Sequence, residues 1–197
     1  MLRRSLALVA VLGLVFALAG AALAADVKVR VEGRTQTIFG SAQPLLQAGN
    51  ALQALEAASV AGEFHYALTS SSFGDYVSQI GKYPGAGDAG WVFKVNGVSP
   101  PVGADQVTLK DGDVVLWYWA TFGPAGGPPT LELDRLPGEC YRVSAVDDKG
   151  LRTPAAGAVL HVDSRRVKTA SGRGCVGRHQ GVVRAFAPGA VRSNSMR

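Results

Sequence analysis

The chain has little of the chemistry that enzymes and metal sites use. Its 197 residues include two cysteines and three histidines, and no G-x-S-x-G motif occurs that would form a nucleophile elbow. His65, His161 and His179 lack the short mutual spacings of metal ligands. Two G-x-G-x-x-G strings, at 85–90 and 172–177, lack the strand-before, helix-after context of a dinucleotide site. We therefore expect neither an enzyme nor a metal site.

Long apolar runs are also scarce, and the single one lies at the N-terminus. Residues 1–24 have the parts of a secretory signal peptide: a basic start, an apolar run from Leu6 to Leu18, and a small-x-small cleavage site at 22–24. The mature chain is then expected to begin at Ala25. No later run is long enough for a membrane span, so we expect a secreted or cell-surface protein without one after signal cleavage.

The two cysteines, Cys140 and Cys175, both lie in the C-terminal half. In an exported protein, an even pair without a redox motif predicts a disulfide, and a pair of free buried thiols is the alternative. A disulfide is also a better explanation of Cys175 than a thiol nucleophile formed with His179. A closed loop of about 35 residues would contribute roughly 3–4 kcal/mol in a loop-entropy model.

The net positive charge of the expected mature chain comes from its C-terminal half. The chain carries a formal net charge of +5, but residues 27–122 have six Lys or Arg against eight Asp or Glu, whereas residues 131–197 have twelve against six. All three tryptophans lie in the other half. This separation lacks the basic and stacking residues of a nucleic-acid binder, so no nucleic-acid partner is expected. The basic half is either a solvated surface or a site for cell-surface components such as an anionic polymer.

The N-terminal part, residues 25–123, has the element order of a β-grasp domain. The alternating valines of residues 27–31 predict a half-buried strand, with its polar residues facing solvent, and residues 35–39 are expected to return beside it. A helix is predicted from the N-cap at Asn50 to Gly62, followed by a strand over 64–68. We therefore expect an α+β, β-grasp-like fold here.

The Gly- and Pro-rich segment 124–130 predicts a linker to a second module, residues 131–197. Short strands at 141–146, 158–162 and 182–186, with turn residues between them, favour a small all-β module. The pattern resembles immunoglobulin-like or prealbumin-like sandwich modules of bacterial surface proteins. A module of this size needs its disulfide or its neighbour for stability.

The aromatic residues concentrate between Gly90 and Trp119, and this segment carries a family resemblance. The strings GWVFKVNGV and LKDGDVVLWYW, with the upstream Ser72-Phe73-Gly74-Asp75-Tyr76, resemble a DUF4430-like domain of exported bacterial proteins. That domain is similar to the C-terminal β-domain of transcobalamin and intrinsic factor. The resemblance covers about residues 27–122. It implies a β-grasp-like fold and a corrinoid, such as cobalamin, or another planar small molecule as ligand.

The candidate ligand-binding residues are Phe73, Gly74, Tyr76, Trp91, Trp117, Tyr118 and Trp119. Strand alternation places Trp117 and Trp119 on one face and Tyr118 on the other, so we expect at least one of the three to be exposed. Trp91 is expected in the core, and residues 73–76 are favoured as a turn with two core anchors over a ligand-contacting element. Two functions remain open: a non-enzymatic binder of a corrinoid or other flat molecule, and a structural or adhesive cell-surface module without one.

Overall fold

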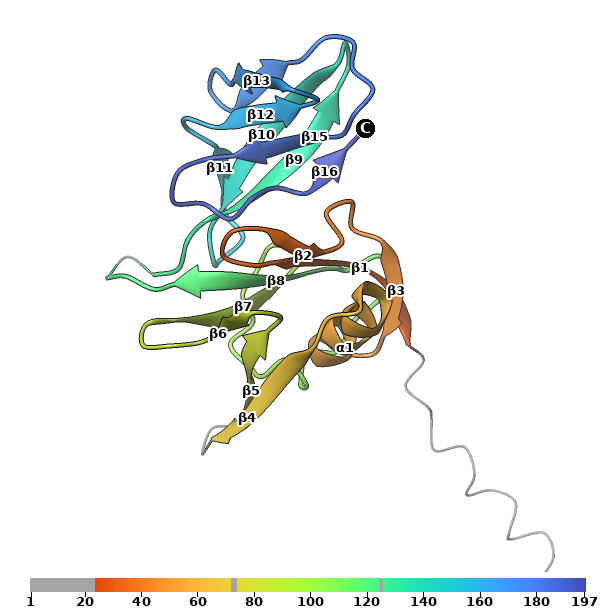
Figure 1. Cartoon of the computed structure of the whole chain (residues 1–197), viewed down its shortest axis with the longest axis vertical. Helices are drawn as coiled ribbons and strands as arrows, with labels where there is room; N and C mark the ends of the chain where they lie inside the picture. Colours follow the sequence, from red (N-terminus) through yellow and green to blue (C-terminus); the bar gives the residue numbers. More distant parts are fainter. Residues whose placement is uncertain (1–23, 72–73, 125) are drawn as a thin grey trace, which may run out of the picture.

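The computed structural model describes residues 24–71, 74–124 and 126–197, and is mostly β-sheet with one helix in these ranges (Figure 1). The predicted signal peptide lies outside the described residues except for Ala24. Within the described ranges, no helix has both the length and the apolar character that a membrane crossing requires.

Five strands of the N-terminal part form one sheet: β1 (Ala25–Glu32), β2 (Thr37–Phe39), β3 (Leu45–Ala48), β7 (Ala89–Val95) and β8 (Val114–Thr121). The strand order is β2-β1-β8-β7, and β3 also pairs with β1. β1 and β8 run parallel, while the other pairs are antiparallel. The first and last strands of this sheet along the chain, β1 and β8, therefore lie side by side at its centre, and β7 lies at one edge.

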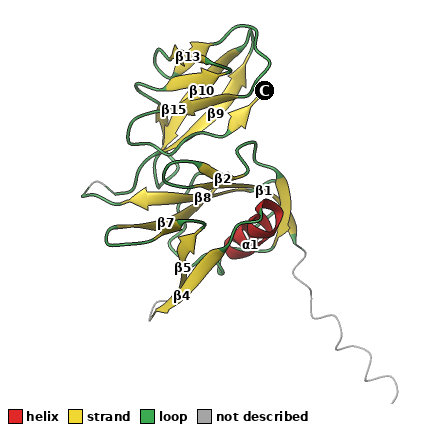
Figure 2. Ribbon diagram, viewed as in Figure 1, coloured by secondary structure: helices red, strands yellow, loops and turns green. Residues whose placement is uncertain are grey.

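The helix α1 (Ala51–Gly62) lies against one face of this sheet (Figure 2). The side chain of Asn50 caps it as predicted, accepting a hydrogen bond of 2.8 Å from the backbone N–H of Gln53. The helix buries Ala51, Ala54, Leu55 and Ala58 in one cluster with the valines of β1. A small side chain at three of these positions lets the helix lie close to the sheet.

A second, three-stranded sheet follows the helix, formed by β4 (Tyr66–Ser71), β5 (Gly74–Ile80) and β6 (Tyr83–Pro84). The predicted strand over 64–68 overlaps β4, which begins two residues later than predicted and extends further toward the C-terminus. The expected turn at 73–76 is wrong for its described part, since residues from Gly74 onward form β5. Tyr76 is 53% exposed and is not a core anchor, while Phe73 lies outside the described residues.

The C-terminal part consists of two four-stranded sheets. One contains β9 (Thr130–Leu136), β10 (Cys140–Val146), β11 (Arg152–Pro154) and β14 (Arg173–Cys175); the other contains β12 (Val159–Val162), β13 (Arg165–Lys168), β15 (Val183–Phe186) and β16 (Ser195–Met196). Leu133 and Tyr141 of the first sheet and Leu160 and Val183 of the second are buried in a common cluster. The predicted all-β sandwich is confirmed.

The predicted disulfide is also confirmed, because Cys140 and Cys175 are bonded to each other and lie opposite in the register of β10 and β14. The bond therefore joins two neighbouring strands of one sheet and closes a loop with a sequence separation of 35.

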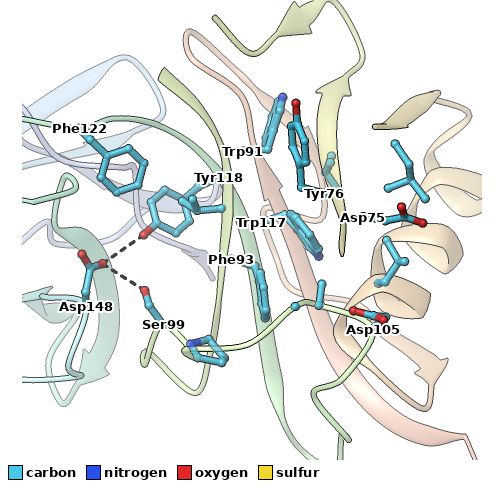
Figure 3. Close-up of a pocket in the computed structure, with 17 residues that line it drawn as sticks. Asp75, Tyr76, Trp91, Phe93, Ser99, Asp105, Trp117, Tyr118, Phe122 and Asp148 are labelled. Carbon is cyan, nitrogen blue, oxygen red and sulfur yellow. Dashed lines mark hydrogen bonds between the residues drawn. The ribbon is translucent and has the colours of Figure 1, made fainter. Parts of the chain in front are cut away.

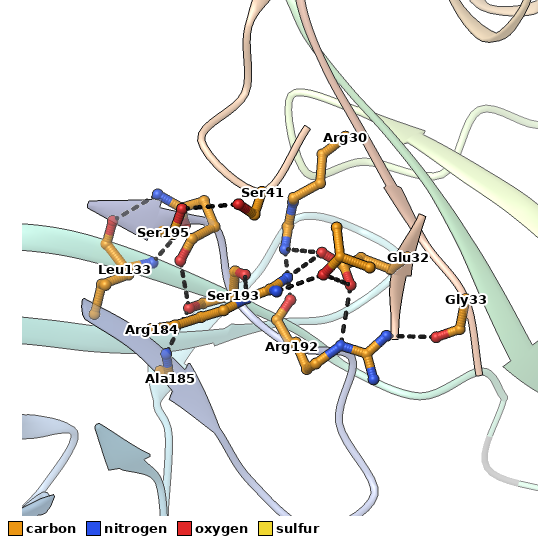
Figure 4. A network of polar contacts seen from close by, with 12 residues as sticks. Arg30, Glu32, Gly33, Ser41, Leu133, Arg184, Ala185, Arg192, Ser193 and Ser195 are labelled. Atoms are coloured by element: carbon orange, nitrogen blue, oxygen red, sulfur yellow. Dashed lines mark hydrogen bonds and ion pairs between the residues drawn. The ribbon is translucent and has the colours of Figure 1, made fainter. Parts of the chain in front are cut away.

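A buried polar network joins the two parts of the chain (Figure 4). The carboxylate of Glu32, on β1, accepts hydrogen bonds from Arg30 Nη1 at 3.3 Å and from Arg192 Nε at 3.1 Å, and also pairs with Arg184. Arg184 and Arg192 belong to the C-terminal sandwich and its last loop. Burial lowers the pKa of Arg30 to about 10, against the opposing effect of Glu32.

This network corrects one expectation. The polar residues that alternate with the valines of β1 are expected to face solvent, yet Arg30 and Glu32 are 2% and 0% exposed. The reason is that the C-terminal part covers this face of the sheet. Leu116 and Tyr118 of β8 are buried on the same side, in a cluster that includes Val191.

Candidate functional site

A pocket of about 260 Å³ opens along β7, and we call it the β7-edge pocket (Figure 3). Residues from the helix, from the four strands β4, β5, β7 and β8, from the loop after β7 and from the C-terminal part contribute to it. Its lining residues are Leu52, Leu68, Asp75, Tyr76, Val77, Trp91, Val92, Phe93, Ser99, Pro100, Gly103, Ala104, Asp105, Trp117, Tyr118, Phe122 and Asp148. Most of this lining is apolar.

Strand register places the aromatic side chains of one wall. Trp91 and Phe93 of β7 lie opposite Trp119 and Trp117 of β8, so all four share the face that α1 covers. Phe93 and Trp117 are stacked, with ring centroids 5.0 Å apart. The indole of Trp117 donates a hydrogen bond of 3.0 Å to the backbone carbonyl of Ala51, at the start of the helix. This wall is therefore held in place by the core itself.

Trp91 is held in a similar way. It is 8% exposed, and its indole N–H donates to the carbonyl of Tyr83 at 2.8 Å. The Trp91 and Trp119 rings meet edge to face at 5.8 Å. The expectation that Trp91 belongs to the core is confirmed, and it lines the pocket as well.

The other wall lies on the opposite face of the sheet and depends on the C-terminal part. The Tyr118 hydroxyl donates to Asp148 Oδ1 at 3.3 Å, and the Ser99 hydroxyl donates to the same atom at 3.2 Å. The Lys94 ammonium lies 3.4 Å from this oxygen and donates to the carbonyls of Val146 and Asp147. Burial, with a smaller contribution from Asp148, raises the pKa of Tyr118, so its phenol remains a donor.

The rim of the pocket combines exposed apolar groups with carboxylates. Tyr76, Leu68 and Phe122 are 53%, 42% and 39% exposed. The side chains of Asp75 and Asp105 are also exposed, and neither forms an ion pair with another described residue. The rim is thus able to take an apolar group that has a positive charge nearby.

The structure brings together four of the seven predicted ligand-binding residues, namely Tyr76, Trp91, Trp117 and Tyr118. Trp119 packs on Trp91 and does not line this pocket, and neither does Gly74, which begins β5. Phe73 lies outside the described residues.

The predicted exposure within this aromatic strand is wrong. Trp117 and Tyr118 are 2% and 1% exposed, and Trp119 is half-buried. Each face of β8 is covered: α1 packs on Trp117, and the C-terminal part packs on Tyr118. A sequence pattern gives the two faces of a strand but does not show that both are buried.

Several lining residues had no sequence signal. Leu52 belongs to the apolar stripe of the helix, which predicts burial and not a pocket. Leu68, Phe122, Asp105 and Asp148 are isolated residues of strands or loops, and only the fold places them together. Among the described residues, no group of three or more His, Cys, Asp or Glu is placed to hold a metal ion.

Comparison with known proteins matches part of the chain. Residues 48–121, from the end of β3 to the end of β8, match the family model described as "Domain of unknown function (DUF4430)". This range includes α1, β7 and β8 and most of the pocket lining. A search of curated proteins finds no match.

One solved structure similar to this chain is that of "a putative metal binding protein from Ruminococcus gnavus ATCC 29149". The sequences are 17% identical, the similarity covers 48% of this chain and 95% of that chain, and the TM-score is 0.37.

Proposed function

We propose that the chain is a non-enzymatic binding module and that the β7-edge pocket is its binding site. The observation that carries this proposal is the pocket itself, in which buried aromatic walls meet an exposed apolar rim. Concave apolar sites with a few fixed polar groups are typical of ligand pockets. Here the fixed polar groups are the Tyr118 hydroxyl and the Asp148 carboxylate, which are already hydrogen-bonded to each other.

A flat apolar group is the chemistry that this pocket fits best, because its walls are the faces and edges of aromatic rings. The transcobalamin resemblance makes a corrinoid the first ligand to test. The parallel pairing of β1 with β8 and the helix on one face support the β-grasp-like assignment on which that resemblance depends. With about 260 Å³, the pocket is slightly smaller than typical drug-sized sites of about 300–1,000 Å³, so it would receive one edge of a corrinoid.

The test is a titration of the mature protein with cyanocobalamin and, separately, with Nile red, an uncharged flat dye. Binding is read from tryptophan quenching, since two of the three tryptophans line the pocket. Tyr76→Ala should weaken binding of whichever ligand responds, with little effect on folding because this side chain is 53% exposed. Val60→Ala is the matched control, since Val60 is 72% exposed and lies outside the pocket.

The two ligands separate the general proposal of a binding module from the specific proposal of a corrinoid ligand. Binding of Nile red with no response to cyanocobalamin at high micromolar concentration would leave a binding module and remove the corrinoid. No response to either ligand, or equal effects of the two substitutions, would count against the pocket as a site for flat molecules.

A structural or adhesive cell-surface module is the second candidate function. The disulfide-linked C-terminal sandwich supports it, since disulfides are typical of exported proteins. Export itself is tested by the mass of the protein recovered from its host, which should correspond to a chain that begins at Ala25.

A further inference from the structure

The β7 strand has one free edge, and the hydrogen bonds around it show which backbone groups face outward. β7 pairs only with β8 among the described strands. The backbone N–H of Asn96 donates to Val114 of the incoming β8 strand at 2.9 Å, so Asn96 faces β8. Because backbone groups alternate in direction along an antiparallel strand, Lys94 and Val92 also face β8, whereas Phe93 and Trp91 face away from it.

Two turns close the ends of this free edge. Val95 and Val98 exchange backbone hydrogen bonds of 2.9 and 3.0 Å around the Asn96-Gly97 turn, in which both residues have the positive φ that such a turn requires. Ala86 and Ala89 exchange bonds of 2.9 and 3.1 Å at the other end. The backbone groups of Val95 and Ala89 thus point away from β8, as the alternation along β7 requires for odd-numbered residues.

Between the two turns, the backbone N–H and C=O groups of Trp91 and Phe93 have no hydrogen-bond partner among the described residues. They form a short open segment with two donors and two acceptors. An unpaired strand edge is a template on which another strand can form.

The open segment coincides with the β7-edge pocket. The side chains of Trp91 and Phe93 line one wall, on the face that α1 covers, and those of Val92 and Tyr118 line the wall on the opposite face. Figure 3 shows Trp91 and Phe93 on one side of the strand and Tyr118 on the other. A pocket that extends to both faces of an edge strand lies where the next strand of the sheet would run.

We propose that this edge binds an extended peptide segment as an added strand, with apolar side chains and at least one lysine or arginine. The inference rests on the proposed function, because it names the ligand class of the same pocket. The unpaired groups of Trp91 and Phe93 supply main-chain hydrogen bonds, and the two walls receive side chains that alternate in direction. Asp75 and Asp105 supply the negative charge that selects a basic residue.

The charge of the rim also argues against a second copy of this chain as the occupant. Pairing of two β7 edges would bring the Asp75 and Asp105 carboxylates of one copy toward those of the other, and like charges across paired strands are destabilising. A basic peptide meets these carboxylates with opposite charge instead.

Amide hydrogen exchange of the full mature chain tests the proposal, with acetyl-Val-Lys-Val-Lys-Val-Lys-amide as the probe. In the free protein, we expect the amides of Trp91 and Phe93 to exchange fast and those of Val92 and Lys94 to exchange slowly. At a peptide concentration ten times the Kd, exchange at Trp91 and Phe93 should slow about tenfold, because about one protein in eleven is then free. Unchanged exchange at these two amides with bound peptide would overturn strand addition.

Two N-methylated peptides provide a control that does not depend on the pairing register. One carries N-methyl groups on all valines and the other on all lysines, so only one of the two loses the donors that face β7. One peptide should lose binding and the other should keep it. Equal binding by both would overturn the proposed main-chain pairing.

Charge is tested on both partners. A peptide with glutamate in place of lysine should bind more weakly than the probe, and the Asp75→Asn/Asp105→Asn double variant should reduce this preference. Asp26→Asn, a change of an exposed carboxylate outside the pocket, should leave it unchanged. If the lysine peptide and the glutamate peptide bind equally well, or if their affinity ratio is the same in the wild type and the double variant, the assigned charge selection would be overturned.

The failure of this inference is distinguishable from failure of the proposed function. If Nile red binds in a Tyr76-dependent way and the peptide does not, the pocket stands as a binding site and the peptide proposal falls. If neither binds, both fall. If the amides of Trp91 and Phe93 become more protected from exchange as protein concentration rises in the absence of peptide, the edge pairs with a second copy of the chain. That result would overturn the peptide proposal.

Discussion

The substitution Glu32→Gln tests how strongly the two parts of the chain are held together. It keeps the shape of the side chain but leaves three guanidinium groups without their shared carboxylate. Loss of one partner from a buried ion pair costs about 3–5 kcal/mol. The side chains of Arg184 and Arg192 are each 15% exposed, and glutamine still has one accepting oxygen, so we expect the lower end, about 3 kcal/mol.

Urea unfolding measures this loss. With an m-value of about 2 kcal/mol/M, the midpoint should fall by about 1.5 M. Tryptophan fluorescence reports only the N-terminal part, since all three tryptophans lie between residues 91 and 119, whereas far-ultraviolet circular dichroism reports both parts. The two transitions should coincide in the wild type and separate in the variant, because Glu32 lies between the parts.

Asp134→Asn is the matched control for this experiment. It removes a surface pair with Arg142, whose side chains are 60% and 39% exposed, and such pairs contribute about 0–1 kcal/mol. A Glu32→Gln variant that unfolds within about 1 kcal/mol of the wild type, as the control should, would refute the assigned strength of the buried network.

Three further measurements address the sandwich, a helix contact and the pocket wall. The Cys140→Ala/Cys175→Ala variant should lose about 3–4 kcal/mol of unfolding free energy in urea, and an unchanged midpoint would contradict the loop-entropy estimate. Burial and the hydrogen bond to Glu56 raise the pKa of Tyr66 to about 12, so phenolate absorption should show that value and Glu56→Gln should lower it; an unchanged pKa would refute the contact. The Tyr66 phenol of the unfolded chain loses its proton at a lower pH than that of the folded chain. The stability that the protonated Tyr66 contributes should therefore be lost as pH rises from about 10 to about 12. Trp91→Ala should cost about 3–5 kcal/mol by thermal or urea unfolding, and a wild-type midpoint would show that this indole is not part of the core.

Local patterns predicted much of the secondary structure. The alternation of residues 27–31, the capping residue Asn50 and the turn at Asn96-Gly97 each depend on neighbours close in sequence, and each is present in the structure. The disulfide was predictable because two cysteines allow only one intramolecular pairing. Division of the chain at the Gly- and Pro-rich segment 124–130 stays a prediction.

Burial on the second face of the sheet was not predictable from local patterns. Arg30 and Glu32 have the alternation of solvent-facing residues, and their burial depends on Arg184 and Arg192, more than 150 residues away along the chain. Charged residues are usually exposed, so sequence reasoning places them on the surface. They are buried when an oppositely charged partner compensates them, and here that partner is distant in the sequence. The same covering explains why Tyr118 is buried.

The covered face also determines what the pocket is able to do. Lys94 lies on β7 between Phe93 and the Asn96-Gly97 turn, and its ammonium donates to the carbonyls of Val146 and Asp147 in the C-terminal part. The strand is therefore fixed from one side by the sandwich and from the other by the contacts of Trp91 with Tyr83. Because a binding edge that is already ordered loses little conformational entropy when a ligand arrives, more of the interaction energy is available for affinity. If the β7-edge pocket binds a ligand as proposed, the C-terminal sandwich contributes in two ways, through the Asp148 wall and through the rigidity of β7.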